Sequence, residues 1–200
     1  MDKVSIQRAW EATRYDDLST LETYVKTKED ANSKIISDKN HCHSLLMAAA
    51  AHGALQCAEY LIKQGADVNM KNFHGFTAIH WAGFTGRTNV IPLLIQNGAD
   101  IESRTADGKT PIHIASFRGQ KSFVDFILKN CNADINSVDA EGRNALFYAV
   151  SANQKATAEY LLQNNISIGQ CDAHHKNVTE FANNPSHKWF SDLLQKLELL

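Results

Sequence analysis

The sequence repeats itself with a period of about 33 residues, and this constrains its fold more than any other feature. The segment at residues 65–82 returns at 98–115 and again at 132–149, and a degraded copy follows at 165–182. Successive copies of the motif end on alanines, at Ala49, Ala82, Ala115, Ala149 and Ala182. A unit this small cannot bury its apolar face alone, so the period predicts units that stack on their neighbours.

Each unit has the sequence signals of a turn followed by two short helices. Gly108 marks a tight turn that needs a permissive backbone. Thr110 then precedes an apolar run as a helix N-cap, and Pro111 stands at the first helical position, where a missing N–H costs nothing. A second apolar run follows at 123–128, and in the preceding unit Gly98 ends the corresponding helix.

Residues 107–115, which read DGKTPIHIA, carry the best copy of the motif. With its period, the pattern resembles the ankyrin repeat, and the resemblance extends over about residues 5–200. It implies an all-α ankyrin-repeat solenoid of stacked helix-turn-helix units with short β-hairpin-like turns, forming a single domain over 1–200. The expected units are an N-terminal capping unit at 3–37, full repeats at 38–70, 71–103, 104–137 and 138–170, and a C-terminal capping unit at 171–200.

The two terminal units depart from the pattern. The first lacks the turn and its glycine, and the last has Glu180 where the family has a histidine. Such atypical units suit the ends of a solenoid, which must expose one face to water. The link between the first two units, residues 26–40, is polar and longer than the period requires, and we expect it to be the most mobile segment.

Composition excludes several classes of function. Twenty basic residues stand against 22 acidic ones, giving a net charge of −2, whereas nucleic-acid binders usually carry a basic excess. The longest apolar run, residues 45–51, is far shorter than the roughly 20 residues of a membrane-spanning helix. The four cysteines are widely spaced and favour free thiols in a reducing compartment. We therefore expect a cytoplasmic monomer, with the nucleus or a host cytosol as the alternative locations.

The sequence contains no recognisable catalytic or metal-binding motif. His80 and His113 occupy the histidine position of the motif, where the resemblance implies hydrogen bonds to backbone and threonine groups rather than catalysis. The Cys/His clusters at 41–43 and 171–175 lie at the same repeat position in distant units, too far apart to share a metal ion. No cofactor or metal is expected.

The resemblance implies a protein partner that docks on the concave face, at the positions that vary in the family. An exposed aromatic cluster with arginine is typical of a binding patch. The alternative is that some phenylalanines fold inward, and Trp81 and Tyr148 are expected to pack between helices. The candidate partner-binding residues are Phe73, His74, Phe76, Phe84, Thr85, Asp107, Lys109, Phe117, Arg118, Glu141 and Arg143.

Asn69 and Asn136 occupy the asparagine of the family's D-V-N turn. The resemblance implies that such asparagines are sometimes hydroxylated, so both are candidate modification sites. The competing interpretation is a turn asparagine that bonds to its own backbone, and it is the one we favour.

The function predicted from these observations is a non-catalytic protein–protein interaction module, acting as an adaptor, inhibitor, assembly factor or effector. One alternative is the ankyrin segment of a longer protein, and another is an effector delivered into a host cell. An enzyme or small-ligand carrier is the least favoured hypothesis, because the sequence offers no nucleophile–base pair and stacked repeats form an open groove.

Overall fold

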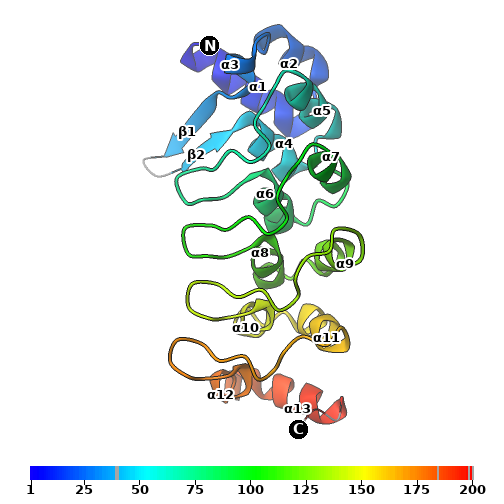
Figure 1. The fold of residues 1–200 in the computed structure, drawn as a ribbon. Coiled ribbons are helices and arrows are strands. Elements are labelled where there is room, and N and C mark those ends of the chain that lie inside the picture. Colours follow the sequence, from blue (N-terminus) through cyan, green and yellow to red (C-terminus); the bar gives the residue numbers. More distant parts are fainter. Residues whose placement is uncertain (39–40, 184, 198, 200) are drawn as a thin grey trace.

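Pairs of short helices follow one another along the chain and stack into an elongated array, with the two termini at opposite ends (Figure 1). The computed structural model describes residues 1–38, 41–183, 185–197 and 199. The first helices of successive units are α1 (Lys3–Tyr15), α4 (Leu45–His52), α6 (Ala78–Thr85), α8 (Pro111–Phe117), α10 (Ala145–Ser151) and α12 (Val178–Phe181). The second helices are α2 (Leu18–Tyr24), α5 (Leu55–Lys63), α7 (Ile91–Gln96), α9 (Lys121–Asn130), α11 (Lys155–Gln163) and α13 (Lys188–Lys196).

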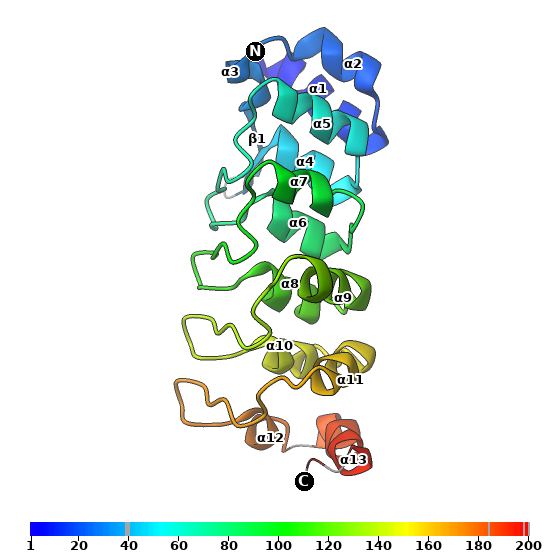
Figure 2. The ribbon, with the colours of Figure 1, turned by 45° about the vertical axis from the view of Figure 1, so that its right-hand side comes forward.

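The two sets of helices form two columns, and the turns project from the column of first helices (Figures 1 and 2). The recurring alanines lie inside the first column, where Ala82, Ala115 and Ala149 are fully buried. A methyl side chain lets neighbouring first helices approach closely, and each of α1, α4, α6, α8 and α10 packs on the next. The all-α solenoid predicted from the period is confirmed.

The predicted helix starts are also confirmed. Thr77, Thr110 and Asn144 are the N-caps of α6, α8 and α10, and Pro111 lies at the first position of its helix. Gly86 ends α6 in the left-handed conformation. These local signals therefore set the ends of each helix before any contact between units is made.

Two buried histidines tie a helix start to the turn of the next unit. The backbone N–H groups of Thr77 and Thr110 donate to Nδ1 of His80 and His113 at 3.2 and 3.0 Å. Nδ1 is thus an acceptor, so Nε2 carries the proton. The Nε2 of His80 donates to the Lys109 carbonyl at 3.1 Å, and His113 does the same one unit later. The structural role expected for both histidines is confirmed.

The projecting turns depend on glycine. Gly108 has a φ of +77°, and a Cβ atom at this position would lie 2.6 Å from the backbone nitrogen of Ala140 in the next turn. Gly75 is in the same situation, 2.6 Å from the nitrogen of Ala106. Any side chain here would both strain the backbone and push adjoining turns apart.

The terminal units replace missing motif residues with other interactions. Asp16 adopts the left-handed conformation where later units have glycine, and its carboxylate accepts a hydrogen bond from the backbone N–H of Cys57 at 2.9 Å. Glu180 is exposed and accepts from the backbone N–H of Asn177 at 3.0 Å, completing a capping box at the start of α12. A short 3₁₀ helix, η1 (Pro185–His187), precedes α13.

The segment predicted to be a polar link contains regular structure. It forms the one-turn helix α3 (Lys28–Ala31) and strand β1 (Lys34–Asp38), which pairs in antiparallel fashion with β2 (His41–Ser44). Strand β1 spans the expected boundary between residues 37 and 38, and residues 39 and 40 lie outside the described part of the chain. Within that described part, no helix combines the length and apolar character needed to cross a membrane.

Replacing Gly108 with alanine should loosen the stack between units. The added Cβ would meet the Ala140 nitrogen in a left-handed turn, so we expect a loss of about 2 kcal/mol of unfolding free energy, roughly 5 °C or more in melting temperature. Gly169 is the matched control, because a Cβ there meets nothing within 4 Å. Equal melting temperatures for Gly108→Ala and Gly169→Ala, measured by circular dichroism, would refute the close approach.

The buried histidines should make the fold acid-sensitive. Burial lowers the pKa of His80 and of His113 to about 4, from 6.5. Protonation therefore favours the unfolded chain, so the stability is complete above pH 6.5 and falls between pH 6.5 and 4, by up to about 3 kcal/mol for each histidine. Melting temperatures measured across this range should drop steeply.

The matched variant for this experiment is His80→Met/His113→Met, since Met47 fills the same position in another unit. It should be less stable at pH 7.5 and less sensitive to acid. The exposed His174 serves as the control, and its replacement with glutamine should leave the pH profile unchanged. A double variant with the wild-type profile would show that the acid sensitivity arises elsewhere.

Candidate functional site

The candidate site lies on the face formed by the projecting turns and the first helices, which we call the concave face. Neighbouring turns on this face are joined by one backbone hydrogen bond each. Ala106 N–H donates to the His74 carbonyl at 3.0 Å, and Ala140 N–H donates to the backbone carbonyl of Asp107 at 3.1 Å. The last bond of the series runs from the N–H of Ala173 to the backbone carbonyl of Glu141 at 2.8 Å. The backbone of the site is therefore held in place before any partner binds.

An apolar hollow of about 210 Å³ opens at the centre of this face, and we call it the Phe117 hollow. Its walls come from three successive units. They are Phe76, Phe84, Lys109, Ile114, Phe117 and Tyr148. Phe117 is 47% exposed, whereas Phe76, Phe84 and Tyr148 are partly buried. Four of the predicted partner-binding residues thus meet in one depression.

Aromatic contacts hold the walls of the Phe117 hollow. The rings of Phe117 and Tyr148 meet edge to face with centroids 6.4 Å apart. The Phe84 ring contacts Trp81 at 5.4 Å, and the guanidinium of Arg118 lies over its face at 4.3 Å. These contacts fix the ring orientations while leaving an apolar surface open to solvent.

Tyr148 is anchored by a buried carboxylate. Its hydroxyl donates to Asp139, which also accepts a hydrogen bond from Nη2 of Arg143 at 2.9 Å. Burial by itself would raise the pKa of Asp139, but the hydrogen bonds from Tyr148 and Arg143 outweigh it and hold that pKa below its ordinary value. The carboxylate therefore stays ionised, and Arg143 supports the wall of the hollow instead of reaching toward solvent.

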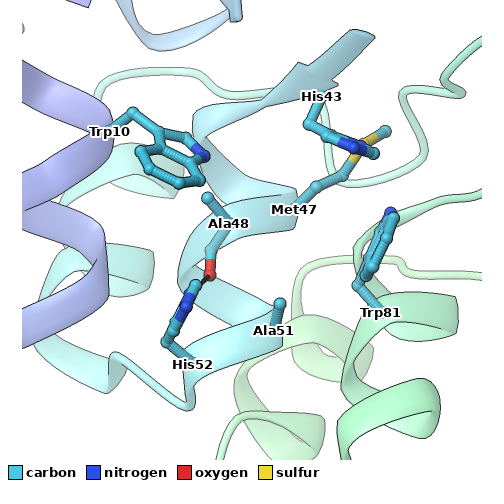
Figure 3. A pocket seen from close by; sticks show the side chains of 7 residues that line it. All are labelled: Trp10, His43, Met47, Ala48, Ala51, His52 and Trp81. Carbon is cyan, nitrogen blue, oxygen red and sulfur yellow. Dashed lines mark hydrogen bonds between the residues drawn. The ribbon is translucent and has the colours of Figure 1, made fainter. Parts of the chain in front are cut away.

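A second apolar hollow of about 190 Å³ lies toward the N-terminal end of the same face (Figure 3), and we call it the Trp10 hollow. Trp10 and Trp81 stand on opposite sides of it, with Met47 and His43 between them. The other lining residues are Ala48, Ala51 and His52. Nδ1 of His52 donates to the Ala48 carbonyl at 2.9 Å, which fixes this ring at the edge of the hollow.

The Trp10 hollow was missed by sequence reasoning, and so was the part played by Trp81 and Tyr148. Both were expected to pack between helices, and both are indeed partly buried, but each turns one side of its ring toward a hollow. Trp10 went unnoticed because the first unit lacks the motif that would have aligned it with the others. The available signal was a large aromatic residue on three of the first helices, at Trp10 in α1, Trp81 in α6 and Tyr148 in α10.

The remaining predicted residues do not line either hollow. Phe73 is 78% exposed and meets the ring of His74 edge to face, with centroids 5.6 Å apart. The Thr85 hydroxyl is turned back to the Trp81 carbonyl at 2.9 Å. Asp107 and Glu141 are exposed but paired with neighbouring bases, as described below.

Asn69 and Asn136 bridge neighbouring units. The amide of Asn69 donates to the Gly98 carbonyl at 2.7 Å and accepts from the backbone N–H of Asp100 at 3.0 Å. Asn136 accepts from the backbone N–H of Ser167 at 2.8 Å. The sequence analysis favoured a bond to the asparagine's own backbone, whereas these bonds join each asparagine to the backbone of the next unit.

The described residues contain no group of three or more His, Cys, Asp or Glu side chains that would hold a metal ion. The side chains of His41 and Cys42, which belong to one of the clusters considered above, lie outside the described part. Of the thiols, Cys57 is buried, and burial raises its pKa to about 12, which leaves it protonated and unreactive.

Comparison with known proteins agrees with this architecture. The family model described as ankyrin repeats (3 copies) matches residues 10–105 and 93–172, which together cover most of the chain. A search of curated proteins finds no match. The matched segments contain both hollows and the helices that form them, so the repeat assignment rests on sequence and geometry alike. The chain belongs to the ankyrin-repeat family.

Proposed function

We propose that this chain is a non-catalytic binding module that holds a partner protein on its concave face. The observation that carries the proposal is the pair of apolar hollows, lined by partly exposed aromatic side chains on a pre-ordered backbone. Ankyrin repeats are generally protein–protein interaction modules, which supports the same conclusion.

The sizes of the hollows favour a protein partner over a small ligand. Each has about 190–210 Å³, below the roughly 300–1,000 Å³ of sites that enclose drug-sized molecules. Hollows of this kind take individual side chains of a partner, and buried aromatic anchors usually supply most of the binding energy. A rigid backbone adds affinity because little ordering is needed on association.

The buried histidines have structural hydrogen-bond partners, which supports a module that binds without catalysis. His80 and His113 use both ring nitrogens in hydrogen bonds to their own turn and the next. Their lowered pKa keeps them neutral at physiological pH, and burial keeps them away from any bound molecule. They stabilise the scaffold on which the aromatic residues are displayed.

The double variant Phe84→Asp/Phe117→Asp should abolish partner capture while leaving the fold intact. Each lost anchor costs about 2 kcal/mol of binding, roughly thirty-fold in Kd. Phe117 is half exposed, and an aspartate at 84 would lie beside Arg118, so we expect a melting temperature within about 4 °C of wild type. The readout is affinity capture from lysate of the source cell, quantified by mass spectrometry.

A matched variant makes this experiment interpretable. Leu55→Asp places the same kind of substitution on an exposed position of a second helix, away from the concave face. It should retain the partner. Capture of the same protein by the double variant would show that the partner uses another surface, and a large fall in melting temperature would show that the two rings belong to the core.

A further inference from the structure

Two exposed arginines stack on aromatic rings that line the hollows, and neither has a carboxylate partner among the described residues. The guanidinium of Arg14 lies 5.4 Å from the centre of the Trp10 ring, and that of Arg118 lies 4.3 Å from the centre of the Phe84 ring. Both side chains are exposed, and neither forms an ion pair with any residue that the structure describes. Each hollow therefore has an apolar floor and an unpaired positive charge beside it.

The carboxylates near the hollows contact basic or polar neighbours. Asp107 pairs with Lys109 at 3.1 Å, while Glu141 and Asp139 share the single guanidinium of Arg143, at 3.0 and 2.9 Å. Near the other hollow, Glu11 pairs with Arg8 at 3.5 Å and accepts a hydrogen bond from Gln7 at 3.1 Å. Of the cations that lie over rings lining the hollows, Lys109 and Arg143 are paired, whereas Arg14 and Arg118 form no ion pair within the described part of the chain.

The two hollows are neighbours along the solenoid. The Trp10 hollow is bounded by α1, α4 and α6, and the Phe117 hollow by α6, α8 and α10, so their centres are two helix steps apart. Packed helices are about 8–10 Å apart, which gives roughly 16–20 Å between the hollows. Trp81 forms the ridge between them, in contact with Phe76 at 5.7 Å and Phe84 at 5.4 Å, so the apolar surface is continuous.

We propose that the concave face binds an extended acidic segment of a partner protein, with two bulky apolar side chains about six residues apart and an Asp or Glu next to each. The segment rises about 3.3 Å per residue, so six residues span the distance between the hollows. An even separation places both anchors on the same side of an extended chain. This inference rests on the proposed function and adds the chemistry of the partner.

The carboxylates of the segment form ion pairs with Arg14 and Arg118. A guanidinium that already stacks on an aromatic ring still has N–H groups at its edge, and these bind a carboxylate in two parallel hydrogen bonds. The apolar neighbour of each acid then enters the hollow beside that ring. A basic segment would instead meet Arg14 and Arg118 with like charge and would be rejected.

The test uses random 16-residue peptides displayed on phage, selected on the wild-type protein and counter-selected on the Phe84→Asp/Phe117→Asp variant. We expect enriched sequences with two bulky apolar residues six apart, each adjacent to Asp or Glu. A synthetic copy of the best sequence, measured by fluorescence anisotropy, should lose roughly tenfold in affinity to Arg118→Glu and to Arg14→Glu. Replacing its acidic residues with lysine should restore binding to the charge-reversed variants.

Arg87→Glu is the matched control, because Arg87 is an exposed arginine in the turn after α6 and lines neither hollow. It should bind the peptide as the wild type does. The inference is overturned if the enriched sequences are basic or uncharged, if their anchors follow a helical spacing, if nothing is enriched, or if the arginine reversals have no effect.

The two proposals fail in distinguishable ways. If the phenylalanine double variant loses the cellular partner but the peptides are not acidic, the binding module stands and the partner chemistry proposed here is wrong. If the double variant keeps the cellular partner, the concave face is not the docking surface and both proposals fall.

Discussion

A backbone hydrogen bond from a turn to the turn before it joins neighbouring units at three junctions of the described chain, and the concave face depends on it. The bond requires two turns to approach so closely that only glycine fits, as at Gly75 and Gly108. The histidine bridges beneath it hold the helix starts in the same register. Each unit takes its orientation from its neighbour, so the relative positions of the turns, first helices and hollows follow from this repeated close approach.

The sequence predicted the stacking because the stacking residues act locally. Thr110 and Pro111 favour the start of a helix, and Gly108 tolerates the left-handed turn before it. Because a glycine and an N-cap residue recur at these positions, the period predicted the first helices of the inner units. The terminal units were harder to predict, because other residues take the places of the motif residues there. Asp16 adopts the left-handed conformation in place of a glycine, and Glu180 accepts the N-cap hydrogen bond in place of a histidine. Strand β2 lies in the turn of the second unit, where the resemblance implied a β-hairpin-like turn, but its partner β1 lies mostly in the link before that unit, where no regular structure was predicted.

The candidate site could be predicted only in part, and the reason is that exposure is a property of neighbouring units. Phe117 could be expected at the surface from its place in the motif. Trp81 and Tyr148 were expected to pack between helices, but each ring packs on one unit and also lines a hollow beside the next. Which side of such a ring stays open depends on the residue that faces it from the next unit, and the sequence alone does not give the separation between the two residues.

The same arrangement couples binding to the integrity of the solenoid. Each hollow takes its walls from first helices of three successive units, so a side chain that enters it contacts all three. A segment that fills both hollows would bridge α1 through α10 and would stabilise their stacking by mass action, since it binds only the assembled array. The pairing of the buried Asp139 with the partly exposed Arg143 fits this view, because it fixes the hydroxyl of Tyr148 and so the position of that ring.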